Sequence, residues 1–242
     1  MILLRSTLFN LLFFAATGAM VIAGLPLLAF RGQHIIRYVR AWARLVLWLL
    51  RVVCDMRLRV TGAEHLPQGG AALIAAQHQS TLDTIVWNAL LPAPVYVLKA
   101  ELLRIPLWGS LARHVGSIPV VRSGGAAALK GLVRAARGAV AAGRQIVIFP
   151  EGTRTPPGER RRWQPGLAAL AAATGLPVIP VATDAGRFWG RRAYLKRPGV
   201  VTLAVLPPLP PDLPREELMA RAQRSVETAA HGLEGAVDNS VE

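Results

Sequence analysis

The chain has 242 residues, enough for one sizeable domain or one domain with an anchor. Hydrophobic residues make up 52% of it and charged residues 17%, a composition that is apolar for a soluble protein. The formal net charge of +14 favours an anionic partner, and the apolar content favours a membrane surface over a nucleic acid. The single cysteine, Cys54, excludes an internal disulfide and a cysteine metal cluster.

The first element is an uncharged stretch, LFNLLFFAATGAMVIAGLPLLAF, which runs from Leu8 to Phe30 with Asn10 as its one amide. About 20 apolar residues suffice to cross a bilayer core, so this stretch is long enough for a membrane span. A secretory signal peptide is the alternative, but its apolar region is shorter, and no clear small-x-small cleavage site follows this one. The arginines that follow the stretch place the next domain on the cytoplasmic side by the positive-inside rule.

A second apolar run, Trp42–Cys54, carries Arg44 and Arg51 and predicts an amphipathic helix that lies in the membrane interface. The two segments form either a helical hairpin that dips into one leaflet, with Pro26 bending the first segment, or one span and one surface helix. The sequence leaves both arrangements open. We expect residues 1–54 to anchor the chain, residues 55–228 to form a globular domain, and residues 229–242 to form a polar tail that frays.

From Asp55 onward, short apolar runs alternate with helical patterns. Runs typical of strands occur at residues 57–62, 71–77, 95–102, 116–122, 144–150, 177–183 and 200–209. Helical patterns occur at residues 81–91, 124–143 and 166–174, and again from about residue 215. Strands that alternate with helices predict an α/β layer structure.

The segment HQSTLD, residues 78–83, follows the second of these predicted strands. Ser80 and Asp83 form an S-x-x-D capping box, which by itself explains the aspartate as part of a helix start. The cap leaves His78 unexplained at the end of the strand. Residues five apart do not share a helix face, but a strand-turn-helix bend can bring His78 and Asp83 together, so that the carboxylate orients the imidazole while the imidazole takes a proton from a hydroxyl. These residues alone leave the cap and the catalytic pair both open.

The segment FPEGTR, Phe149–Arg154, follows another predicted strand. Pro150 and Gly152 predict a tight turn at the strand end. Arg154 suits phosphate recognition because its planar guanidinium binds oxyanions through two parallel hydrogen bonds. The alternative is a surface loop in which Glu151 and Arg154 form an exposed ion pair of little energetic value.

Two further segments, GSIPVVR at residues 116–122 and VIPVA at residues 178–182, are each typical of an ordinary strand. In order and spacing, however, HQSTLD, GSIPVVR, FPEGTR and VIPVA together resemble the 1-acylglycerol-3-phosphate acyltransferase family of glycerolipid acyltransferases. KAELLRIPLWG, residues 99–109, is similar to the family's segment between the first two blocks, and the resemblance covers about Val60 to Leu209. Gln77 departs from the family, since many members carry Asn before the His, and GSIPVVR lacks the aromatic-acidic pair that many members have before the Arg.

The resemblance implies an α/β fold with a central mixed β-sheet flanked by helices and with an N-terminal membrane-associated helical hairpin. It implies transfer of a fatty acyl group from acyl-CoA or acyl-carrier protein to the free sn-2 hydroxyl of 1-acyl-sn-glycerol 3-phosphate, which gives phosphatidic acid. The partners implied are membrane lipids, a lyso-phospholipid acceptor and the thioester donor, with no cofactor, no metal and no nucleic acid.

The resemblance also assigns roles to residues. His78 is the general base, and Asp83 orients it. Arg122 and Arg154 bind the acceptor phosphate, while Ser80 is a cap or acceptor-positioning group rather than a nucleophile. The remaining predicted substrate-binding residues are those of the FPEGTR turn: Glu151, Gly152 and Thr153.

Three rival interpretations remain. The first is an acyltransferase of the same fold with another acceptor, such as glycerol 3-phosphate or a lyso-ornithine lipid. The second is a non-catalytic membrane lipid-binding protein, which the combination of His78, Asp83 and FPEGTR disfavours. The third is a nucleic-acid binder, for which the sequence holds no zinc-finger spacing and no aromatic RNA-binding signature. The run ERRRW, residues 159–163, has two interpretations. It contacts lipid headgroups or an acidic acyl donor, or it is a solvated charged loop.

Overall fold

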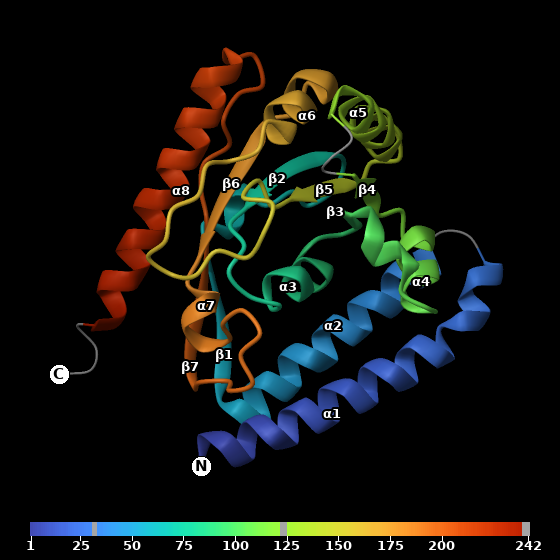
Figure 1. Cartoon of the computed structure of the whole chain (residues 1–242), viewed down its shortest axis with the longest axis vertical. Coiled ribbons are helices and arrows are strands. Elements are labelled where there is room, and N and C mark those ends of the chain that lie inside the picture. The colour runs from blue at the N-terminus through green and yellow to red at the C-terminus, as the bar shows by residue number, and fades with distance from the viewer. Residues whose placement is uncertain (31–32, 122–124, 239–242) are drawn as a thin grey trace.

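The computed structural model describes residues 1–30, 33–121 and 125–238 (Figure 1). Over these residues, seven strands form one sheet in the order β1-β7-β6-β2-β5-β3-β4. The strands are β1 Met56–Thr61, β2 Ala72–Ala76, β3 Pro94–Lys99, β4 Ile118–Val120, β5 Gln145–Ile148, β6 Val178–Thr183 and β7 Gly199–Val205. Neighbouring strands run parallel except β6 and β7, which are antiparallel, so the predicted central mixed sheet is confirmed.

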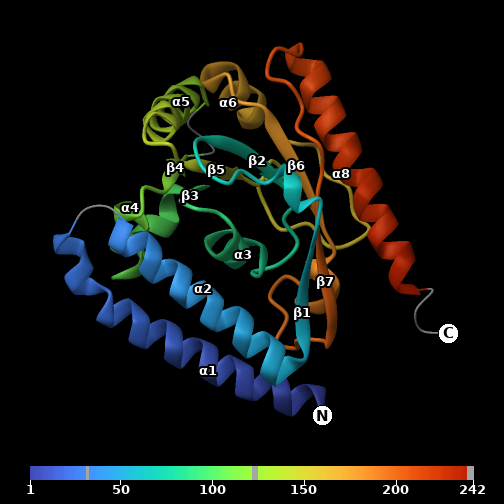
Figure 2. The same ribbon diagram turned by 180° about the vertical axis from the view of Figure 1, so that it is seen from behind.

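The helices in the described residues are α1 Ile2–Ala23, α2 Gln33–Cys54, α3 Asp83–Leu90, α4 Trp108–His114, α5 Gly125–Ala141, α6 Gly166–Thr174, α7 Ala185–Phe188 and α8 Arg215–Asp238. Three short 3-10 helices join them: η1 Leu25–Ala29, η2 Ala63–His65 and η3 Ala100–Arg104. Helices α2 and α3 cover one face of the sheet, and α5, α6 and α8 cover the other. Both views show α1 beside α2, on the outside of this layer (Figures 1 and 2).

The central strand β2 is buried on both faces. Its residues alternate between the two cores, with Ile74 packed on the side of α2 and α3 and with Leu73 and Ala75 packed on the side of α5, α6 and α8. A parallel strand covered on both faces needs apolar side chains throughout, which explains the continuous run ALIAA. The polar residues that follow β2 therefore emerge from the middle of the sheet.

Helix α2 is longer than the predicted Trp42–Cys54, and protein covers its apolar stripe. Ala43, Val46 and Leu50 are buried in the same core as α3 and β1, so the stripe that we assigned to the membrane interface packs on the domain. An amphipathic pattern shows that a stripe must be covered, but it does not say whether protein or lipid covers it.

Helix α1 differs from α2 because most of its surface is open. In the described part of the chain, Ile2–Ala29 is the one segment long and apolar enough to cross a membrane, and only 6% of its apolar window is buried. Leu4, Leu11 and Phe14 are exposed over 75%, 66% and 69% of their surface. Large exposed apolar faces of this kind mark sites of membrane or protein contact.

The polar residues of α1 hold it against the loop between α7 and β7. Lys196, only 3% exposed, donates its ammonium to Asn10 Oδ1 (2.5 Å) and to the Tyr194 carbonyl (2.8 Å), and its backbone N–H donates to Ser6 Oγ (2.9 Å). The ammonium also lies 4.9 Å from the centre of the Trp189 ring. Asn10, the one amide of the predicted span, is thus the partner of a buried lysine, and these contacts favour a hairpin that lies along the domain.

Helix α8 continues beyond the residue where we expected a fraying tail. It runs to Asp238, and Ala230 is buried in the core on the α5, α6 and α8 side. Glu234 accepts hydrogen bonds from the Gly158 N–H and from the Arg187 guanidinium. The expectation that the chain frays directly after Ala229 is therefore wrong, because tertiary contacts hold the last turns of the helix.

We expect Lys196→Met to lower the free energy of unfolding by about 1–3 kcal/mol, because it leaves Asn10 and the Tyr194 carbonyl without the charged donor. Thermal unfolding in detergent measures the effect. The matched control is Arg197→Met, which changes an exposed neighbour on the same loop. Equal melting temperatures for the two variants would contradict the role of Lys196 in holding α1.

Candidate functional site

His78, Asp83 and the FPEGTR turn, all of them predicted site residues, meet at one edge of the sheet. The strand order places β2 between β5 and β6, and these three strands are parallel, so their carboxyl ends lie together. His78 follows β2, Glu151 follows β5, and Asp184 follows β6. The carboxyl ends of strands are where open α/β sheets bind their ligands.

One carboxylate oxygen organises the bend after β2. Asp83 Oδ2 accepts from the backbone N–H groups of Gln79 (2.7 Å) and Ser80 (2.6 Å), and it lies 3.1 Å from His78 Nδ1. Ser80 Oγ accepts from the Leu82 N–H (3.1 Å), and Ser80 is fully buried. The helix start and the His–Asp pair are therefore one structure, in which the carboxylate that closes the turn also holds the imidazole.

The His78 ring is fixed on its face as well as at its edge. It stacks on Phe149 with ring centroids 4.2 Å apart, and Phe149 stacks in turn with Tyr96. With Nδ1 facing Asp83, the other ring nitrogen, Nε2, has no hydrogen-bond partner among the residues that the structure describes. The His78 side chain is 13% exposed, so a substrate hydroxyl has access to a ring that is otherwise held in place.

The FPEGTR segment forms the predicted tight turn. The Gly152 N–H donates to the Phe149 carbonyl (2.9 Å), and Gly152 has a φ of +70°, a left-handed conformation that suits glycine. The turn is bonded to the backbone of His78: Glu151 Oε2 accepts the His78 N–H (3.2 Å), and the His78 carbonyl accepts the Thr155 N–H (2.7 Å). The loops after β2 and β5 thus hold each other.

Glu151 is buried rather than part of an exposed ion pair with Arg154. It is 8% exposed, and this burial raises its pKa from 4.5 to about 7, although the hydrogen bond from the His78 N–H favours the charged form. The alternative of a surface Glu–Arg pair is contradicted. The contact of Glu151 with the His78 backbone was not predicted, because it joins two loops that follow different strands.

Arg154 and Thr153 are half-buried. Burial lowers the pKa of Arg154, while the nearby Asp83 raises it and the nearby Arg191 and Arg192 lower it. Arg154 makes no hydrogen bond or ion pair within residues 1–30, 33–121 and 125–238. Arg154 thus lies within electrostatic reach of Asp83 and of two further arginines, and such a concentration of positive charge suits a bound anion. Arg122, the other predicted phosphate ligand, lies outside the described residues.

Two glutamines join the loop after β2 to the loop after β6, which the sequence analysis did not predict. Gln79 Oε1 accepts the Gly186 N–H (3.0 Å), and Gln77 Oε1 accepts the Thr183 N–H (3.1 Å). A Cβ at Gly186 would lie 2.9 Å from Gln79 Cβ and from Pro157, so a side chain at this position would push the loops apart. The only sequence signal was Gln77, seen as a departure from the family's Asn. In the described chain, no group of three or more His, Cys, Asp or Glu side chains is placed to hold a metal.

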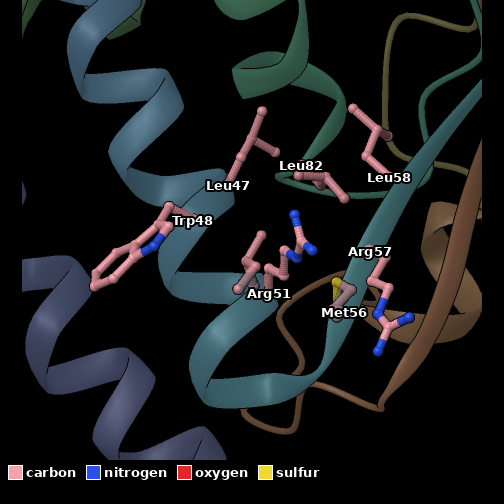
Figure 3. A pocket seen from close by; sticks show the side chains of 8 residues that line it. Leu47, Trp48, Arg51, Met56, Arg57, Leu58 and Leu82 are labelled. Carbon is pink, nitrogen blue, oxygen red and sulfur yellow. The ribbon is translucent and has the colours of Figure 1, made fainter.

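A groove of about 480 Å³ lies between α2 and β1 (Figure 3). Its lining is mostly apolar, and it comprises Leu47, Trp48, Leu50, Arg51, Met56, Arg57, Leu58 and Leu82. Leu82 directly precedes Asp83, so the groove reaches the beginning of α3. It is therefore a candidate place for an apolar chain close to the His–Asp pair.

Known proteins match this chain over a region that includes His78, Asp83 and the FPEGTR turn. The family model described as Acyltransferase matches residues 57–184. A 1-acyl-sn-glycerol-3-phosphate acyltransferase from Pseudomonas aeruginosa is 35% identical over 84% of this chain and 80% of its own length. An enzyme of the same name from Limnanthes alba is 30% identical over 69% of this chain and 58% of its own length.

A solved structure shows the same fold. The crystal structure of the 1-acyl-sn-glycerophosphate (LPA) acyltransferase PlsC from Thermotoga maritima matches with a TM-score of 0.78 and 23% identity. The match covers 97% of this chain and 98% of that one. The likeness therefore includes the hairpin and the sheet together.

The raised pKa of Glu151 predicts how stability depends on pH. Folded Glu151 keeps a proton that the unfolded chain releases above about pH 4.5. The contribution of this proton to the free energy of unfolding is therefore full below pH 4.5 and is lost as the pH rises through about 7. Its full size is about 3 kcal/mol. Glu151→Gln keeps the acceptor for the His78 N–H and removes the titration. We expect the stability of the variant relative to the native protein to increase between pH 5 and pH 8 in thermal unfolding. A constant difference over this range would contradict the assignment.

Proposed function

This chain belongs to the acyltransferase family, and on that premise we propose that it transfers a fatty acyl group to the free sn-2 hydroxyl of 1-acyl-sn-glycerol 3-phosphate, giving phosphatidic acid. The names of the relatives from Pseudomonas aeruginosa and Limnanthes alba support this acceptor. The observation that carries the proposal is the distance of 3.1 Å between His78 Nδ1 and Asp83 Oδ2, in a ring whose other nitrogen has no hydrogen-bond partner among the described residues.

His78 is the general base of the proposed reaction. With its proton on Nδ1 facing Asp83, Nε2 keeps a lone pair that takes the proton from the acceptor hydroxyl. The hydroxyl oxygen attacks the thioester carbonyl, the C–S bond breaks, and the thiolate leaves and takes the proton back from His78. A thiol of pKa about 8.5 is a good leaving group, so no acyl-enzyme is required. Asp83 stabilises the imidazolium during the transfer.

The arginines bind the acceptor phosphate in this proposal. Arg154 supplies a planar guanidinium within electrostatic reach of Asp83, and Arg191 and Arg192 add positive charge. Arg122 remains a proposed ligand on the strength of the family resemblance. Glu151 and Ser80 act through the backbone of the His78 loop, while Gly152 and Thr153 shape the turn that presents Arg154.

The donor is a thioester of CoA or of acyl-carrier protein. The groove that ends at Leu82 is where we place an acyl chain, because its apolar lining leads to the residue before Asp83. Its polar residues, Arg51 and Arg57, come from α2 and β1.

The enzyme works at a membrane, with the domain on the cytoplasmic side. The open apolar face of α1 supports insertion of the hairpin into one leaflet, because Asn10 and Ser6 on the same helix are held against the domain. The arginines of α2 lie next to the anchor, where each basic residue near an anionic surface adds about 1 kcal/mol of attraction. A water-soluble donor and a lipid acceptor then meet at this interface.

We expect His78→Ala to abolish transfer from acyl-CoA and from acyl-carrier protein, because the hydroxyl loses its base. The measurement is phosphatidic acid formed by purified protein. The control is His231→Ala, which removes an exposed imidazole on α8. If the native protein acylates other lyso-lipids only, the acceptor assignment fails while the reaction class stands. Normal turnover by His78→Ala would exclude the general-base role.

Arg154→Ala should raise the KM for 1-acylglycerol 3-phosphate by about 10-fold or more, since a charge-assisted hydrogen bond contributes about 1.5–3 kcal/mol. The kcat should change less. Arg160→Ala is the control, because Arg160 is exposed and pairs with Glu227 on α8. Steady-state kinetics with a phosphate-free monoacylglycerol acceptor would show no such KM difference. Equal losses with both acceptors would contradict a phosphate contact.

A further inference from the structure

The proposed mechanism does not use the segment Leu102–Trp108, which lies between β3 and β4. Its apolar side chains are turned outward: the exposed fractions are 40% for Leu102, 46% for Ile105, 44% for Leu107 and 36% for Trp108. Scattered exposed apolar residues are ordinary, but a contiguous group marks a contact surface. The question is what covers this group.

Internal hydrogen bonds hold the segment in one shape. Leu103 is its buried anchor, and the Leu103 carbonyl accepts from the Arg113 guanidinium (2.5 Å). The Gly109 N–H donates to the Ile105 carbonyl (2.8 Å). A Cβ at Gly109 would lie 2.1 Å from the Leu103 carbonyl oxygen, so this close return of the chain requires glycine.

The backbone is strained where the apolar side chains project. Leu107 has φ +61° and ψ −56°, and the Trp108 N–H donates to the Pro106 carbonyl (2.6 Å), which makes a tight three-residue turn. A bulky residue at positive φ is costly, and such strain is retained where it serves a function. Both residues at this strained turn, Leu107 and Trp108, are exposed.

The segment continues the apolar surface of the hairpin. Helix α4, which follows directly, packs against η1 at the turn of the hairpin, and His114 Nε2 donates to the Phe30 carbonyl (2.7 Å). Both views place α4 beside the end of α1 and the start of α2 (Figures 1 and 2). Phe30 is itself 59% exposed. The exposed residues of the segment thus adjoin those of the anchor.

The charges around the segment suit an anionic lipid surface. Arg104 is exposed within the segment, Arg113 is exposed on α4, and Lys99 is exposed at the end of β3. Glu101, an acidic residue, directly precedes the segment in η3. Basic side chains that flank exposed aliphatic and tryptophan side chains are the composition of a surface that binds at headgroup depth.

We propose that Leu102–Trp108 is a second membrane-contacting element, whose apolar side chains enter an anionic bilayer beside the hairpin. The proposal rests on the membrane association proposed above for α1. A second contact outside α1 limits rotation of the domain about the axis of that helix, whereas one helix alone leaves the domain free to rotate. Since β3 ends at the same sheet edge as β2 and β5, this contact holds the His78 edge at a set angle to the leaflet that contains the acceptor.

Site-specific fluorescence tests the proposal in the full chain. Cys54, the single cysteine, is buried and is replaced by alanine; an environment-sensitive dye is then attached through Leu107→Cys, Leu11→Cys or Thr228→Cys. The second position lies on the open face of α1, and the third is an exposed control on α8. The probe membrane is a vesicle of phosphatidylethanolamine and phosphatidylglycerol that carries nitroxide lipids. We expect blue-shifted emission and nitroxide quenching at positions 107 and 11 but not at 228.

The outcomes separate the two proposals. Quenching at position 11 without quenching at 107 would show that the anchor inserts while the segment stays in water, which overturns this inference alone. No quenching at either position would overturn the membrane association, and this inference with it. A blue shift at 107 that grows with protein concentration without vesicles would assign the surface to a second copy of the chain instead.

Activity gives an independent readout. The double variant Ile105→Ser/Leu107→Ser should lose about tenfold in kcat/KM on acceptor presented in vesicles, from the apolar area withdrawn from lipid. It should keep its activity on acceptor dispersed in detergent. Equal losses on both forms of the acceptor would indicate a structural effect and contradict the proposal, as would no loss on vesicles.

Discussion

The Asp83 carboxylate is the constraint on which the site depends. A carboxylate only 2% exposed needs donors, and Asp83 Oδ2 finds them in the N–H groups of Gln79 and Ser80 and in the His78 ring. Because these donors come from consecutive residues, the bend after β2 has one shape and the imidazole has one position. The bend before α3 and the orientation of the base depend on the same set of bonds.

The sheet order adds the second support. With β5 beside β2, Phe149 stacks on the His78 ring and Glu151 accepts its backbone N–H. With β6 on the other side, the loop after it bonds to Gln79 through Gly186. The base is thus held by three loops, while Nε2 has no hydrogen-bond partner in the part of the chain that the structure describes.

On the membrane side of the molecule, polar side chains also pair with one another. The amide of Asn10, unusual in an apolar helix, pairs with the buried Lys196 and so joins the anchor to the loop that carries Arg191 and Arg192. At the other end of the hairpin, α4 bonds to Phe30 and positions the exposed segment Leu102–Trp108. Both ends of the anchor are therefore tied to the edge of the sheet at which the reaction is proposed to occur.

The sequence by itself determined the local features and the family. Strand and helix periodicity and the glycine turn at Gly152 depend on neighbouring residues, so they were predicted from the chain and the structure has them. The predicted cap at Ser80 differs, because Ser80 Oγ accepts the Leu82 N–H in the bend before α3 and does not cap the helix itself. The order of the four segments was enough to indicate the fold and the reaction class. No local rule, however, states which strands become neighbours.

Only the tertiary structure decided the contacts between distant segments. These include the burial of Glu151 against the His78 backbone, the approach of Arg191 and Arg192 to Arg154, and the pairing of Asn10 with Lys196. The same limit explains the two corrections: protein, not lipid, covers the stripe of α2, and packing extends α8 past Ala229. An apolar stripe or a polar tail indicates whether a segment tends to be covered or exposed. What packs against the segment depends on the order of the strands in the sheet.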